Sequence, residues 1–328
     1  MKLVVVKEEL IGEVLANPIY TENGILFLNK GNKISQKLIM KLREIGVSTI
    51  YIEDGNDEIT LQEILPTPIK LQIINSLKRI FQEIKEIKYI DYEKVMTIVN
   101  NIIENINLYE NAVLISNLIL DDEISKLAIH SLDVSIMTII MGIKKKLKMK
   151  RLIRLGTAAL LHDIGKLFTD NGQHTKIGKE IVKENILFSP TIYMAIYYLY
   201  EREDGSGPHG IKGDKLHEYV KILSICNEYI NSINGEKALL PHEAIEKIIA
   251  QSTTKFDKEI FKEFINSIYC YPNGLQVKLN NGLFGVVVMQ NKGATTRPVI
   301  LINNDNSYSF CNLIDESNLT LFIERVIL

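Results

Sequence analysis

The chain has 328 residues, of which 46% are hydrophobic and 24% are charged. This composition is typical of a folded protein and excludes one that is largely disordered. The formal net charge of −2 also excludes the strongly basic surface of a general nucleic-acid binder, so no nucleic acid is expected as a partner.

The first eight residues contain charged side chains and lack the apolar core of a signal peptide. No run approaches the roughly 18 consecutive apolar residues of a membrane span. Three cysteines at wide spacing, with no Cys-x-x-Cys pair, argue against both a disulfide framework and a structural zinc site. We therefore expect a cytoplasmic protein that has no membrane partner.

Residues 1–58 are predicted to form a small α+β domain. An Asn-Gly pair at 23–24 lies between two short apolar runs, which is a strong signal for a two-residue β-hairpin turn. Ser35 is a candidate N-cap for a helix over residues 36–45, and residues 47–52 are predicted to return to the sheet as a strand. No catalytic motif lies in this segment.

Residues 59–270 are predicted to form an all-helical domain. Apolar residues recur there at the three- and four-residue spacing of amphipathic helices, in the segments 71–84, 95–106, 124–143 and 152–161. Beyond Pro272 the pattern changes to short strands with a second Asn-Gly turn, which indicates a small β-rich extension over residues 271–328. The predicted fold class is therefore mainly α, with a small α+β domain before the helical domain and a β-rich appendage after it.

The most informative motif is His162-Asp163-Ile164-Gly165-Lys166, at the end of an apolar helix. Neutral imidazole and carboxylate groups suit a divalent metal ion that polarises a phosphodiester and lowers the pKa of bound water. An isolated His-Asp pair carries little information by itself. However, His130 lies upstream on its own amphipathic helix and His174 follows, so three of the six histidines flank one carboxylate.

Taken in order, these motifs resemble those of the HD-GYP family, a subgroup of the HD-domain metal-dependent phosphohydrolases. The resemblance covers about residues 110–270 and includes these segments: His130-Ser131-Leu132-Asp133-Val134, the His-Asp-Ile-Gly-Lys motif, His174-Thr175-Lys176-Ile177-Gly178, 201–207, 222–225, 241–245 and Phe256-Asp257. It implies an HD-GYP-type helical domain in a bacterial signalling protein. It also implies a divalent metal cofactor, iron or manganese, and a cyclic dinucleotide, cyclic di-GMP, as the ligand.

The resemblance implies a set of site residues. The candidate metal ligands are His130, His162, Asp163 and His174, with Asn227 as a weaker oxygen ligand. Asp163, which would bridge metal ions, and Lys166, which would contact a phosphate oxygen, are the candidate catalytic residues. We assign substrate binding to Lys166, Lys126 and Arg202.

Several family positions carry other residues in this chain. The family's paired histidines fall on Leu199 and Tyr200, its later aspartate on Asn227, its glutamate before the first histidine on Lys126, and its Gly-Tyr-Pro tripeptide on Gly207-Pro208-His209. A loss of anionic ligands on this scale should remove at least one metal ion. Lys126 lies four residues before His130, on the same helix face, so we hypothesise that its ammonium replaces metal charge.

We therefore expect a cyclic di-GMP phosphodiesterase-like protein with a degenerate metal site, weakly active or inactive, that acts through nucleotide or protein binding. Two alternatives stay open. One is an active phosphodiesterase with a reduced metal centre formed by His130, His162, Asp163 and Asn227. The other is a protein-interaction scaffold that binds neither metal nor nucleotide. Without a metal ion, His130 and His174 would be buried histidines that donate to backbone carbonyls. The sequence does not determine the oligomeric state.

Overall fold

The computed structural model describes residues 1–21, 24–44, 47, 49–53, 62–108, 112–113, 118–119, 122–169, 172–234, 239–304 and 307–327. The chain forms two compact units. Unit 1 comprises Met1–Ile64, Asn107–Asp121 and Ile268–Leu328, and unit 2 comprises Leu65–Ile106 and Asp122–Ser267. The proposed division into three domains, with boundaries at 58/59 and 270/271, stays a prediction. All three cysteines are free and buried.

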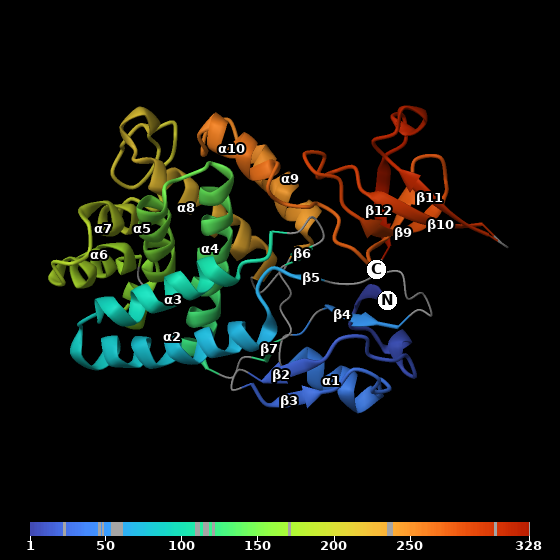
Figure 1. Cartoon of the computed structure of the whole chain (residues 1–328), viewed down its shortest axis with the longest axis horizontal. Helices are drawn as coiled ribbons and strands as arrows, with labels where there is room; N and C mark the ends of the chain where they lie inside the picture. Colours follow the sequence, from blue (N-terminus) through green and yellow to red (C-terminus); the bar gives the residue numbers. More distant parts are fainter. Residues whose placement is uncertain are drawn as a thin grey trace. The chain divides into compact units, whose positions relative to one another are not determined.

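Unit 2 is helical and contains nine α-helices among its described residues (Figure 1). They are α2 Thr67–Ile87, α3 Tyr92–Asn105, α4 Glu123–Lys144, α5 Met149–Leu161, α6 His174–Glu184, α7 Pro190–Tyr197, α8 Glu218–Asn234, α9 Pro241–Gln251 and α10 Lys258–Ile265. Two 3-10 turns, η2 Ile164–Leu167 and η3 Gly213–Lys215, complete the unit. The four helices predicted from apolar periodicity are confirmed, with ends displaced by a few residues.

Helix α4 is the central helix of unit 2 and packs against α2, α5 and α8 (Figure 1). Gly156 lets α5 approach closely, because a Cβ atom there would lie 2.9 Å from Cδ1 of Ile139. Helix α4 has the length and apolar composition of a membrane span, with a mean hydropathy of 1.5, but 78% of that window is buried inside the protein. This burial is expected of a core helix. The cytoplasmic location stays a prediction.

Asp257 is the N-cap of α10, and its Oδ1 accepts hydrogen bonds of 3.0 Å from the backbone N–H groups of Glu259 and Ile260. Its Oδ2 also lies 2.7 Å from Nζ of Lys221. Burial by itself raises the pKa of Asp257, but the hydrogen bonds from Lys221 and the backbone outweigh it, so the pKa lies below its usual value. The carboxylate therefore stabilises the folded state.

We expect Asp257→Ala to lower the free energy of unfolding by about 1–2 kcal/mol at neutral pH, as measured by urea denaturation. A carboxyl whose pKa is depressed by folding stabilises the protein above its unfolded pKa of about 4, and this contribution is lost as the pH falls through the folded pKa. The difference between the variant and the wild type should therefore shrink on acidification. Asp257→Asn is the control that keeps a capping oxygen. An effect of Asp257→Ala that does not depend on pH would contradict the assignment.

Unit 1 begins with a small α+β arrangement. Its elements are β1 Lys2–Val5, η1 Glu8–Leu10, β2 Ile19–Thr21, β3 Leu26–Leu28, α1 Gln36–Glu44, β4 Thr49–Ile52, β5 Gln62–Glu63, β6 Ala112–Val113 and β7 Leu118–Ile119. Strands β2 and β3 form the predicted antiparallel hairpin, although Asn23 of its turn lies outside the described residues. The Ser35 hydroxyl accepts a hydrogen bond from the Leu38 N–H, which confirms the predicted cap. Strand β4 pairs with β1 and not with the hairpin. Strand β2 of the hairpin pairs with β7 on its other edge.

The last part of unit 1 is a five-stranded antiparallel sheet with the order β11-β10-β9-β8-β12. Its strands are β8 Gln276–Leu279, β9 Phe284–Met289, β10 Val299–Asn304, β11 Ser307–Asn312 and β12 Ile323–Ile327, with the turn η4 Glu316–Asn318. The sequence predicted the first three strands. It did not predict β11 and β12, which form the two edges and carry more exposed or charged residues. The predicted fold class is confirmed.

Candidate metal centre

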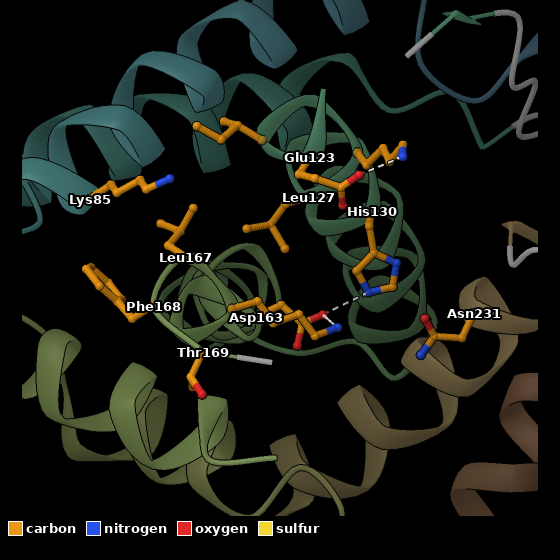
Figure 2. Close-up of a pocket in the computed structure, with 12 residues that line it drawn as sticks. Lys85, Glu123, Leu127, His130, Asp163, Leu167, Phe168, Thr169 and Asn231 are labelled. Carbon is orange, nitrogen blue, oxygen red and sulfur yellow. Dashed lines mark hydrogen bonds and ion pairs between the residues drawn. The ribbon is translucent and has the colours of Figure 1, made fainter. Parts of the chain in front are cut away.

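Side chains from three helices and one turn of unit 2 meet at a single cluster. His130 comes from α4, His162 and Asp163 follow the end of α5, Lys166 lies in η2, and Asn227 lies in α8. Figure 2 shows His130 and Asp163 facing each other from two different elements. The fold thus brings together residues that are up to 97 positions apart in the sequence.

The His-Asp motif forms a tight turn between α5 and η2. Helix α5 ends at Leu161, His162 is its C-cap, and Asp163 has φ −107° and ψ 7° before the 3-10 turn begins. In a 3-10 turn, side chains three residues apart lie above one another. Asp163 and Lys166 therefore project to the same side, with Lys166 Nζ 2.5 Å from Asp163 Oδ2.

The ligand atoms of His130, His162 and Asp163 form a compact triangle. The two Nε2 atoms are 3.2 Å apart, and they lie 3.4 Å and 3.3 Å from Asp163 Oδ2, respectively. A metal ion with bonds of about 2.1 Å has ligand–ligand separations of about 3.0–3.4 Å in octahedral or tetrahedral geometry. The triangle therefore has the size that one bound ion requires, and these three residues could hold a metal ion.

Two neighbouring contacts orient the triangle. The Nδ1–H of His162 donates to the carbonyl oxygen of Ala159 at 2.7 Å, which leaves the lone pair of its Nε2 facing the cluster. Asn227 Oδ1 lies 3.0 Å from His130 Nε2 and accepts a hydrogen bond of 3.2 Å from the Asn231 amide. Asn227 thus lies at the cluster, although its role as a metal ligand stays a prediction, and Asn231 is a supporting residue that the sequence did not reveal.

The electrostatics of the cluster suit cation binding. Burial raises the pKa of Asp163, but the interactions of its carboxylate with His162, His130 and Lys166 together hold it well below its usual range. Burial lowers the pKa of His130, against the opposing hydrogen bond to Asp163. The carboxylate is therefore ionised and His130 is neutral at neutral pH, which are the forms that bind a metal ion.

His174 lies on the other side of Asp163, with its Nε2 3.6 Å from Asp163 Oδ1 and 3.1 Å from the hydroxyl of Tyr200. Burial lowers the pKa of His174. Burial also raises the pKa of Tyr200, and the nearby carboxylates of Asp163 and Glu228 add to the effect. Tyr200 therefore keeps its proton, and its phenol contacts the same nitrogen that His174 would offer to a metal ion. His174 is near the cluster but outside the compact triangle.

A cavity of about 550 Å³ opens beside the cluster (Figure 2). His130, Asp163 and Lys166 line one part of it, together with Asn231. Lys126 also lines the cavity, but its Nζ pairs with Glu123 Oε1 at 2.7 Å and its side chain is 54% exposed. Helical side chains incline towards the helix N-terminus, where Glu123 lies. The ammonium that pairs with Asp163 is that of Lys166, and the hypothesis that Lys126 replaces metal charge stays a prediction.

The segment that follows α7 has a structural role that the sequence did not reveal. The Glu201 carboxylate is buried and accepts backbone hydrogen bonds of 2.7 Å from His209 and 2.8 Å from Ile211, which fix the loop. Arg202, next to it, is exposed and does not line the cavity. Substrate binding by Arg202 and Lys126 stays a prediction, as do the roles assigned to the other site residues.

Comparison with known proteins agrees with this geometry. Residues 127–232, which include the whole cluster, match the family model of the HD domain. The chain is 23% identical to the cyclic di-GMP phosphodiesterase PA4108 of Pseudomonas aeruginosa, over 90% of this chain and 81% of that protein. It is 26% identical to the cyclic di-GMP phosphodiesterase PdeB of Borreliella burgdorferi, over 49% of this chain and 48% of that protein.

The fold is similar to that of a solved structure described as Bd1817, a HDG"Y"P protein from Bdellovibrio bacteriovorus. That match has a TM-score of 0.50 at 17% identity and covers 80% of this chain and 98% of the other. The helical fold and the His/His/Asp cluster define an HD domain. The resemblance to the HD-GYP family that the sequence predicted is confirmed, and the relatives support its phosphodiesterase branch.

Proposed function

We propose that this protein binds cyclic di-GMP at a centre with one divalent metal ion, iron or manganese, and hydrolyses it slowly, so that it acts mainly as a nucleotide-responsive signalling protein. The observation that carries the proposal is the asymmetry around Asp163. On one side, His130 and His162 complete a triangle of ligand size. On the other side, Tyr200 contacts the imidazole of His174.

The residues present fit one ion. Asp163 Oδ1, the oxygen nearer His174, is buried and has no hydrogen-bond partner among the described residues, a cost that a cation bound to the same carboxylate would offset. The His130 and His162 nitrogens approach the other oxygen of the same carboxylate. Two imidazoles, one carboxylate and the amide oxygen of Asn227 make a mixed nitrogen and oxygen set that suits iron or manganese better than calcium.

A divalent ion at this centre would polarise a phosphoryl oxygen and lower the pKa of a bound water molecule. The protein's own residues would do the rest. Asp163 is placed by the turn into η2, and His162 is oriented by its hydrogen bond to the Ala159 carbonyl. Lys166 uses one of its three N–H donors on Asp163 and lines the cavity, so the other donors can bind a phosphate oxygen.

The ligands for a second ion are poor. Leu199 is 1% exposed and has no donor atom, and Tyr200 is a neutral phenol that contacts the His174 nitrogen. Asn227 carries no charge where the resemblance implies an aspartate. Because divalent cations are held largely by the charge and number of their ligands, we expect a reduced site with low turnover.

The direct test is elemental analysis of protein purified without chelator, combined with a hydrolysis assay of cyclic di-GMP in the presence of iron or manganese. We expect about one metal ion per chain, binding of the nucleotide and slow formation of linear product. Two or more ions with rapid turnover would favour the fully active enzyme. Protein that binds neither metal nor nucleotide would favour the scaffold.

The role of Tyr200 can be tested by adding a ligand. We expect Tyr200→His to raise the metal content from about one towards two ions per chain, because an imidazole replaces the phenol and releases His174. Tyr200→Phe is the matched control, since it removes the hydroxyl without adding a ligand. If both variants held no more metal than the wild type, Tyr200 would not limit the second site.

A further inference from the structure

The cavity beside the metal centre has two different ends. Figure 2 shows His130 and Asn231 on one side of the cavity, and Lys85, Phe168 and Thr169 on the other. Its volume of about 550 Å³ lies within the range of pockets that enclose most of a drug-sized ligand. A ligand bound at the metal end therefore has room to extend towards Lys85.

Three lysines line the cavity, and they differ in what neutralises them. The Lys166 ammonium pairs with Asp163 at 2.5 Å, and that of Lys126 pairs with Glu123 at 2.7 Å. Lys85 has no ion-pair partner among the residues that the structure describes. An anion that enters the far end would therefore meet an ammonium whose charge no carboxylate has already compensated.

The wall between the two ends is apolar and aromatic. Leu127 and Leu167 line it, and Phe168 stands next to the end that holds Lys85 (Figure 2). The Lys88 ammonium lies 5.4 Å from the centre of the Phe168 ring, which ties the ring to the last turn of α2. An aromatic ring that lines a cavity provides a surface on which a nucleobase can stack.

We propose that Lys85 and Phe168 form a second subsite, which binds the other phosphate and a base of a dinucleotide whose first phosphate lies at the metal end. The inference rests on the proposed function and adds the means of selecting dinucleotides over mononucleotides. Lys85 belongs to α2, outside the residues 127–232 that match the HD domain. Selectivity is therefore supplied by a helix that precedes the HD domain in the chain.

The test compares the binding of cyclic di-GMP and of GMP by calorimetry, with product formation checked after each titration. We expect Lys85→Met to weaken cyclic di-GMP binding about tenfold, the usual effect of losing one charge-assisted contact, and to leave GMP binding unchanged. Phe168→Leu should also weaken only cyclic di-GMP. The control is Lys94→Met, which removes an exposed lysine of α3 whose Nζ lies 2.7 Å from Glu83 and which does not line the cavity.

The outcomes separate the two proposals. If wild-type protein binds neither nucleotide, the proposed function is wrong. If it binds cyclic di-GMP and Lys85→Met has the same affinity as Lys94→Met, the second subsite is wrong while the proposed function stands. An equal loss for cyclic di-GMP and GMP would also overturn the subsite, because Lys85 would then act at the metal end. Because Lys85 is exposed, thermal unfolding of the variant should match the wild type.

Discussion

Asp163→Asn is expected to abolish the thermal stabilisation that iron or manganese would confer on this protein at the proposed centre. Asp163 supplies the one anionic group of the ligand triangle, and asparagine keeps its shape without its charge. Losing an outer-shell partner of a metal site lowers metal affinity by up to about 100-fold. Asp163 would contact the ion directly, so we expect its loss to lower the affinity by more than that. Metal at 100 times its Kd stabilises a folded protein by about 2.7 kcal/mol, so the missing shift is large enough to measure by calorimetric unfolding.

The control for this variant is Asp133→Asn. Asp133 is also a fully buried aspartate, its Oδ1 lies 3.4 Å from Nζ of Lys70, and its Oδ2 accepts a hydrogen bond of 3.0 Å from the Asn234 amide. It lies on the same helix as His130 but outside the cluster. Asp133→Asn should lower the stability of the metal-free protein and preserve the response to metal. If Asp163→Asn still responded to metal as the wild type does, the proposed centre would be wrong.

Gly165→Ala is expected to destabilise the protein by about 3 kcal/mol and to reduce its metal content. A Cβ atom on Gly165 would overlap the carbonyl oxygen of His174, so the turn η2 and the first turn of α6 would have to separate. Both are backbone segments, and no side-chain rotation can relieve the overlap. Because η2 follows Asp163 directly and α6 begins at His174, the separation would also disturb the metal centre.

The matched control is Gly178→Ala, within α6. A Cβ there would lie 3.3 Å from the nearest atom, a methyl carbon of Ile196, which can adjust, and alanine favours the helix more than glycine does. Urea denaturation and metal analysis of both variants test the prediction. Stabilities of the two variants within about 0.5 kcal/mol of each other would show that the close approach at Gly165 is not required.

A centre of this kind favours recognition over fast chemistry. One carboxylate and two imidazoles can hold an ion and a phosphate oxygen in place. In the proposed function, the contact between His174 and Tyr200 would remove a ligand that a second ion needs. In a signalling protein such a site would convert the presence of a cyclic dinucleotide into a change of stability or of surface. The Tyr200→His variant therefore tests whether one added metal ligand is enough to turn a nucleotide receptor into an active phosphodiesterase.

The sequence by itself determined the helical domain and the core of its site. Apolar periodicity is a local property, and it predicted α2 to α5 because each helix buries one face or, in α4, nearly all of its surface. The His-Asp motif is equally local, because a turn of four residues aligns Asp163 with Lys166. His130 lies 32 positions from His162, and it was the resemblance to the HD-GYP family that placed His130, His162, Asp163 and His174 in one group.

The tertiary structure alone decided which groups complete the site. The direction of a long side chain and the pairing of distant elements depend on contacts that spacing along the chain does not specify. Lys126 shares a helix face with His130 but pairs with Glu123, whereas Tyr200 reaches His174 from 26 positions away. Lys85 reaches the cavity from a helix on which the sequence showed no motif, because the packing of α2 against α4 and η2 brings it there.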